Sequence, residues 1–284
     1  MKSIAPALLA AFTLAAGPAS ALPANNPITV GLVAAYEFSG NADDSSGNGN
    51  DGVVHGATLT ADRFGADNSA YSFDGVSGFV SIDPHFSGYP EFTQLAWIEP
   101  APAVSMGETR ILQLGVGGVM LNTALNELIF EIQADRDGGA SNGSSPSTRY
   151  IYQLTTPHSA SGWSQLALSG HSDNSFSIYV NGSLVYSGFG LTDGGQVGNY
   201  DNSLIGAGNR SQNPPGSEYK FFSGNIDDVY VYDRALSASE VQTLYSAVPE
   251  PTTALLVGLG LIGLSVRRRS SSRLRPRFSQ HPHC

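Results

Sequence analysis

Short runs of alternating apolar residues, separated by glycine-rich turns, fill most of this 284-residue chain. Leu32, Ala34, Tyr36 and Phe38 are an example, and they share one face of an extended segment because successive strand side chains point to opposite sides. Ten or more such runs favour an all-β fold in which two antiparallel sheets pack as a sandwich or jelly roll. A polar, glycine-rich stretch at 135–148 is expected to form a surface loop.

Two local patterns are more specific. Asn181-Gly182 separates the strand-like runs 176–180 and 183–186, and this pair suits the two positive-φ positions of a type I′ hairpin turn. Ser237 precedes Glu240 by three residues, which is a capping box, and it predicts one short C-terminal helix over 237–245.

Both ends of the chain indicate export. Lys2, an apolar region at 4–16 and the small residues Ala19 and Ala21 predict a signal-peptide helix that is cleaved after residue 21. A domain over 22–247 then precedes the sequence Val248-Pro249-Glu250-Pro251, an apolar run at 252–266 and the triplet Arg267-Arg268-Arg269. As a helix that run rises roughly 22 Å, which is short against a hydrocarbon core of about 30 Å. It therefore predicts transient inner-membrane anchoring, with a disordered basic tail at 270–284.

Charge and cysteine content narrow the functions of the 22–247 domain. It contains seven Lys and Arg against 23 Asp and Glu, a net charge of −16. This charge argues against nucleic acid and anionic lipid as partners and favours divalent cations. The single cysteine is Cys284, so the domain has no disulfide, thiolate zinc site or cysteine nucleophile.

The C-terminal order of motif, apolar run and arginines resembles the PEP-CTERM sorting signal of Gram-negative bacteria. That resemblance implies processing by an exosortase-type membrane enzyme near Pro249-Glu250-Pro251, followed by release to the cell surface or extracellular matrix. A plain tail anchor is the alternative.

The domain resembles laminin G-like, concanavalin A-like jelly rolls over most of residues 30–246. The segments that carry the resemblance, in the family's order, are 32–38, 41–52, Tyr71-Ser72-Phe73-Asp74-Gly75, 92–97, 163–167, 178–182 and 224–237. The resemblance implies a recognition fold, often for carbohydrate and often with calcium. Fold alone does not fix function, since lectins, glycan-cleaving enzymes and adhesion modules share this architecture.

Calcium has one candidate site. The loop 41–52 interleaves aspartates and asparagines with glycines, so Asp44, Asn48 and Asn50 can offer oxygen ligands on a backbone that turns easily. The first and last strands of such sandwiches commonly lie together, which adds Asp227 or Asp228. Alternation places Asp227 on the face of Val229 and Val231, where a buried carboxylate requires a cation, an arginine such as Arg234, or several hydrogen bonds. The alternative for the loop is an Asx-rich turn that satisfies its own backbone.

A catalytic site is less favoured than a binding site. Glu127, Glu131, Asp135 and Asp137 share a strand face, as glycosidase carboxylates do, but Gln133 interrupts them and a solvated face explains them as well. The dispersed histidines His55, His85, His158 and His171 suggest ordinary surface residues.

The favoured function is therefore non-catalytic binding, with polysaccharide as the expected partner. The competing hypotheses are a glycan-active hydrolase and a purely structural matrix component. Sugar recognition uses aromatic faces beside polar groups, and loop residues of these types are the candidates: Tyr89, Tyr200, Asn209, Arg210 and Tyr219.

Overall fold

The computed structural model describes residues 26–82, 86, 89–102, 107–114, 118–122, 127–133, 147–153, 162–173, 175–189, 203–208 and 219–247. The chain divides into two compact units, Met1–Ser246 and Ala247–Cys284. The predicted signal peptide, the sorting segment 248–269 and the tail lie outside the described residues. Among the helices of the described part, none is long and apolar enough to cross a membrane.

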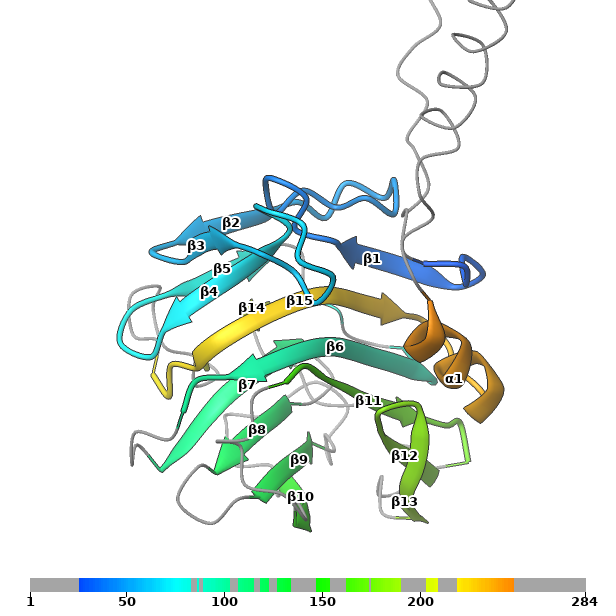
Figure 1. Ribbon diagram of the computed structural model, residues 1–284. Coiled ribbons are helices and arrows are strands. Elements are labelled where there is room, and N and C mark those ends of the chain that lie inside the picture. Colours follow the sequence, from blue (N-terminus) through cyan, green and yellow to red (C-terminus); the bar gives the residue numbers. More distant parts are fainter. Residues whose placement is uncertain are drawn as a thin grey trace, which may run out of the picture. The chain divides into compact units, whose positions relative to one another are not determined.

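Eight antiparallel strands form the first sheet, which we call sheet A (Figure 1). Its hydrogen-bonded path runs β13-β12-β11-β6-β15-β4-β3, and β1 also pairs with β15, so the first and last strands are neighbours as expected. The bounds are β1 (Leu32–Tyr36), β3 (Thr58–Thr60), β4 (Ala70–Asp74), β6 (Phe92–Pro100), β11 (Ser164–Gly170), β12 (Ser175–Val180), β13 (Ser183–Phe189) and β15 (Ser223–Tyr232).

Seven antiparallel strands form the second sheet, sheet B, in the order β10-β9-β8-β7-β14-β5-β2. The bounds are β2 (Gly52–His55), β5 (Phe79–Ile82), β7 (Glu108–Leu114), β8 (Gly118–Asn122), β9 (Glu127–Gln133), β10 (Ser147–Gln153) and β14 (Ser203–Ile205). Together with one short helix, α1 (Ala238–Ser246), these sheets confirm the predicted two-sheet β-sandwich.

The main hydrophobic core joins the two sheets. Sheet A contributes Ala96 and Ile98 from β6, and sheet B contributes Leu112 and Leu114 from β7, all of them at most 1% exposed. A second cluster lies on the other face of sheet A, where Leu95 and Tyr230 pack with Val241 and Leu244 of α1. The helix therefore covers part of the outer face of sheet A.

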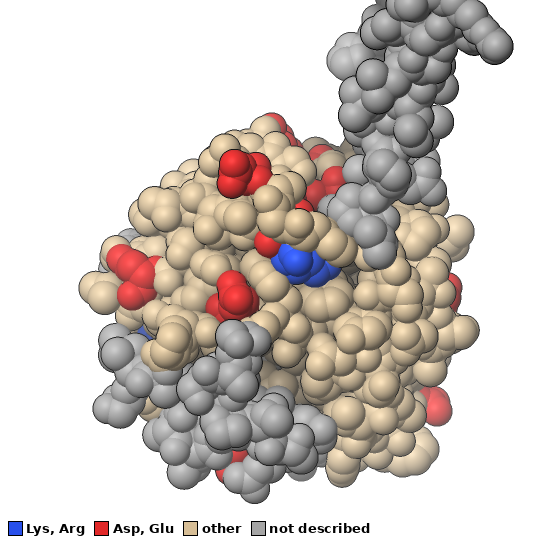
Figure 2. All heavy atoms as spheres, in the orientation of Figure 1, with Lys and Arg blue, Asp and Glu red and all other residues tan. Residues whose placement is uncertain are grey.

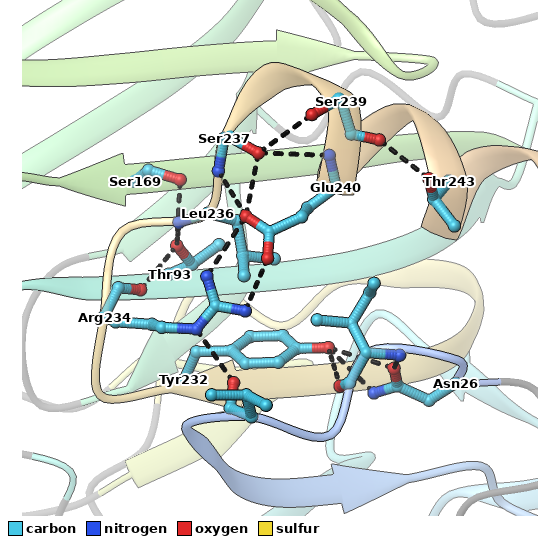
Figure 3. Close-up of polar contacts among 12 residues, drawn as sticks. Asn26, Thr93, Ser169, Tyr232, Arg234, Leu236, Ser237, Ser239, Glu240 and Thr243 are labelled. Atoms are coloured by element: carbon cyan, nitrogen blue, oxygen red, sulfur yellow. Dashed lines mark hydrogen bonds and ion pairs between the residues drawn. The ribbon is translucent and has the colours of Figure 1, made fainter.

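Polar contacts hold α1 in place (Figure 3). Ser237 and Glu240 form the predicted capping box, in which the Ser237 amide donates to Glu240 Oε2 at 2.8 Å and the Glu240 amide donates to Ser237 Oγ at 3.3 Å. Arg234 adds two hydrogen bonds to the Glu240 carboxylate, at 3.1 and 2.7 Å. The buried Thr93 hydroxyl accepts from the Leu236 amide and donates to the Arg234 carbonyl, both at 2.9 Å.

The first strand is shorter and less regular than alternation predicts. It ends at Tyr36, and its register with β15 shifts between Leu32 and Ala34. Ala34 and Tyr36 consequently enter the main core, whereas Leu32 packs with the cluster beneath α1. Phe38 lies beyond the strand at a positive φ of 49° and reaches the core from there. The prediction that these four residues share one strand face is therefore wrong.

Candidate functional site

The Asp44 carboxylate is the centre of the loop 41–52. Its Oδ1 accepts hydrogen bonds from the amides of Ala35 and Ser46, both at 2.9 Å. Its Oδ2 accepts from the Ser46 hydroxyl at 2.8 Å and from the Asn50 amide at 3.0 Å. Four protein donors thus surround a carboxylate that is only 9% exposed, as the self-satisfying Asx turn predicts.

The two asparagines of the loop use their amide nitrogens to bind β1. Asn48 Nδ2 donates to the carbonyls of Leu32 and Val33 at 3.1 and 3.0 Å, and Asn50 Nδ2 donates to the same Val33 carbonyl at 2.9 Å. The Tyr36 hydroxyl, whose pKa burial raises, donates to the Asn50 carbonyl at 2.6 Å. The loop is thereby fastened along the first strand.

A separate ionic cluster lies on the outer face of sheet A. Arg63 Nη1 is 3.0 Å from Asp227 Oδ2 and also contacts Asp228 Oδ2. The three side chains are 5%, 2% and 0% exposed, so two carboxylates and one guanidinium are buried together. Burial raises the pKa of Asp227, and the neighbouring Asp228 raises it further, while Arg63 opposes both effects.

A β-bulge in β15 brings the two aspartates together. The register of β15 on β6 shifts between Asp227 and Tyr230, and Asp228 adopts a positive φ of 43°. The extra residue turns Val229 back into the main core beside Ile226, while Asp227 stays on the outer face opposite Trp97. The prediction that Asp227 shares a face with Val229 and Val231 is therefore wrong.

Aromatic rings complete the surroundings of Arg63. Its guanidinium carbon is 4.5 Å from the Trp97 ring centroid and 4.4 Å from that of Phe64, a cation–π geometry. The Trp97 ring in turn stacks on Tyr245 of α1, with centroids 5.5 Å apart. Arg63 is the partner of Asp227, whereas Arg234, one of the partners predicted from the sequence, pairs with Glu240.

Calcium binding stays a prediction. Within the residues described, no group of three or more His, Cys, Asp or Glu is placed to hold a metal ion. The Asp44 oxygens accept backbone and hydroxyl hydrogens, and Asp227 and Asp228 contact Arg63. Both groups of candidate ligands therefore have partners within the chain.

The predicted glycan contacts are only partly described. Tyr89 is half-buried and packs against the main core, and burial raises the pKa of its hydroxyl. Tyr219 is half-buried beside sheet B, where its backbone pairs with Gly208 at 2.9 and 2.8 Å. Tyr200, Asn209 and Arg210 lie outside the described residues.

The candidate carboxylates of a hydrolase are also only partly described. Glu127 and Glu131 belong to β9, where Glu127 pairs with Gln153 and Glu131 with Arg149 of β10. Asp135 and Asp137, the other two candidates, lie outside the described residues.

The structure adds a group of aromatic residues that the sequence analysis missed. The His55 ring stacks on the Phe79 ring, with centroids 4.3 Å apart and planes 13° from parallel. The ring centroids of Phe79 and Phe221 are 6.3 Å apart. We call these three residues the aromatic strip. The alternation of inward and outward side chains in β2 and β5 could have indicated part of this group from the sequence. His55 and Phe79 both occupy outward positions, and they lie opposite each other in the pair of strands.

Charge on the face of the molecule drawn in Figure 2 fits the acidic composition. Asp and Glu side chains are spread over that face among uncharged residues, and Lys and Arg side chains are few. They form no basic patch there of the kind that would attract phosphate groups.

The described strands form an antiparallel β-sandwich, and this architecture places the protein in the jelly-roll class. The chain belongs to the concanavalin A-like lectin/glucanases superfamily, whose laminin G family model matches residues 73–242. A second model, the PEP-CTERM protein-sorting motif, matches residues 247–269. The two resemblances stated from the sequence are thus confirmed, and the sorting motif marks the chain for export and surface sorting.

Solved structures share the fold at low sequence identity. The binding domain of paraclostridial mosquitocidal protein 1 has 18% identity and a TM-score of 0.58, over 76% of this chain and 52% of its own. The binding domain of botulinum neurotoxin serotype D/C VPI 5993 has 15% identity and a TM-score of 0.57, with the same coverage. The receptor binding domain of botulinum neurotoxin type G has 14% identity and a TM-score of 0.55, over 75% and 50%.

This chain therefore spans about half the length of the solved structures it matches. None of the curated proteins matches it.

Proposed function

We propose that this exported protein binds carbohydrate through its sandwich domain without cleaving it, and that an exosortase-type enzyme processes it near Pro249-Glu250-Pro251. The observation that carries the proposal is the joint occurrence of the two family matches. A lectin/glucanase-type domain matches over 73–242, and a sorting motif follows directly at 247–269.

Binding is favoured over hydrolysis by the solved relatives. Two of these structures are binding domains by name, and non-catalytic use of the sandwich is compatible with them. Glu127 and Glu131 lie in the regular strand β9, where they are opposite Gln153 and Arg149 in the backbone register with β10. Transient inner-membrane anchoring through 252–266 and final residence at the cell surface or in the matrix belong to the same proposal.

A glycan array tests the binding proposal. The full chain, purified in a detergent without a sugar headgroup, is applied first with calcium and then with chelator. We expect retention on at least one glycan class, without release of reducing ends from that glycan. If retention is lost in chelator, calcium takes part in glycan binding. A chain that is retained by no glycan in either condition would contradict carbohydrate binding.

A further inference from the structure

The outer face of β2 and β5 carries an ordered row of side chains. Val54 and Val80, which are paired across the two strands, pack into the main core. The alternate residues therefore point outward, and they form two further pairs, Val53 with Ser81 and His55 with Phe79. Val53 is 59% exposed and His55 is exposed, so this face is open to solvent.

Hydrogen bonds and ring contacts fix the aromatic strip. His55 Nε2 lies 2.9 Å from the Ser81 hydroxyl, which orients the imidazole over Phe79. Phe222 is fully buried in the main core, whereas the ring of the preceding Phe221 is half-buried and lies beside the ring of Phe79, with centroids 6.3 Å apart. Because these side chains are held before any ligand arrives, binding would cost little side-chain entropy.

The segment next to the strip has balanced charge. Lys220 Nζ contacts Glu108 Oε2 at 2.7 Å and lies 5.7 Å from the Tyr219 ring centroid. The Lys220 carbonyl accepts from the Arg110 amide at 2.6 Å, and Tyr219 pairs with Gly208, so the backbone on this side is also fixed. The strip therefore lies beside an ion pair of no net charge, on a domain whose net charge is −16.

We propose that the aromatic strip is the contact surface for an uncharged polysaccharide chain. This inference rests on the proposed carbohydrate function and names its site and ligand class. Sugar rings present apolar C–H faces that pack on aromatic rings, while their hydroxyls bond to polar groups such as Ser81 and the Lys220–Glu108 pair. The acidic domain repels uronic-acid polymers, which leaves neutral glycans as the matching class.

Affinity electrophoresis tests the site with defined probes. The full chain, in the same kind of detergent, is run through native gels that contain dextran, galactomannan, hydroxyethyl cellulose or, as an anionic probe, alginate. His55→Ala and Phe221→Ala remove one ring each, and His55→Phe keeps a ring. Phe189→Ala is the matched control, because Phe189 is an aromatic residue of β13 in sheet A that is 77% exposed.

We expect at least one neutral polysaccharide to retard the wild type, Phe189→Ala and His55→Phe. His55→Ala and Phe221→Ala should each weaken that retardation by about fivefold, a loss typical of one aromatic contact. Thermal melts of each variant report whether it is folded. If folded His55→Ala and Phe221→Ala bind like the wild type, the aromatic strip is not the binding surface, while the proposal of carbohydrate binding still stands. Retardation by alginate alone overturns the neutral ligand class. Absence of retardation in all gels, together with an empty glycan array, overturns the carbohydrate proposal itself.

Discussion

At the scale of single residues, Arg63 joins a buried ionic cluster. Its one guanidinium contacts the carboxylates of Asp227 and Asp228, and the rings of Trp97 and Phe64 lie against it. The loop that carries Arg63 is itself ordered by Asp62, whose Oδ1 accepts from the amides of Phe64 and Ala66 at 2.8 Å. Because removal of one partner leaves buried charge without compensation, such clusters are sensitive to a single substitution.

Arg63→Ala should lower the free energy of unfolding by about 3–5 kcal/mol, since it leaves Asp227 and Asp228 buried without their cation. Urea unfolding followed by tryptophan fluorescence measures the loss. Arg234→Ala is the control, because its half-exposed pair with Glu240 should contribute only about 1 kcal/mol. Adding Asp227→Asn to Arg63→Ala should recover part of the loss. Equal costs for the two arginine variants would contradict the importance of the buried cluster.

At the scale of elements, the sequence predicted the structures that depend on interactions between residues close together in the chain. The Asn181-Gly182 turn adopts positive φ values of 49° and 72°, and the Ser237–Glu240 box begins α1, because both depend on residues within a few positions. The Arg63 cluster could not be predicted in this way. Arg63 and Asp227 are 164 residues apart in sequence, and a one-residue bulge reverses the alternation of β15 beside Asp227. The aromatic strip likewise needed the pairing of β2 with β5 and the position of Phe221.

Gly182 provides a test of the turn and of its contact with the helix. A Cβ at this position would lie 2.8 Å from both Gln242 Oε1 and Tyr245 Cβ of α1, in addition to the strain of its positive φ. Gly182→Ala should therefore destabilise the domain by about 2 kcal/mol. Gly65→Ala has a similar φ of 82° and open space around it, so it should cost only about 1 kcal/mol. Equal melting temperatures for the two variants would refute the steric contribution.

At the scale of the whole molecule, the binding domain and the sorting motif follow each other with no intervening linker in sequence. Helix α1 ends at Ser246, and the sorting match begins at residue 247. The domain carries the acidic charge, whereas six arginines lie after Val266, so the sign of the charge reverses along the chain. This division follows the family matches, since the sorting motif covers residues 247–269 and the sandwich carries the proposed binding function.

Processing makes a direct prediction about the mature protein. Mass spectrometry of the chain recovered from the cell surface should give a C-terminus near Pro249-Glu250-Pro251, and the arginines and Cys284 should be missing. Loss of Arg267, Arg268 and Arg269 by substitution should trap the protein before processing, because in the proposed anchoring step the arginines would hold that end on the cytoplasmic side. A mature protein that retains Cys284 would indicate a plain tail anchor.

The position of β15 has a consequence for the order in which the protein is made and moved. This strand pairs with β1, β4 and β6, yet among the described strands it is the last to be synthesised. Asn26 and Tyr232, 206 residues apart, bond to each other at 2.8 Å. Sheet A therefore cannot close until residue 232 is available, and contacts of such long sequence separation form slowly. A chain exported from its N-terminus would cross the membrane largely unfolded and complete its fold only as its final segment arrives.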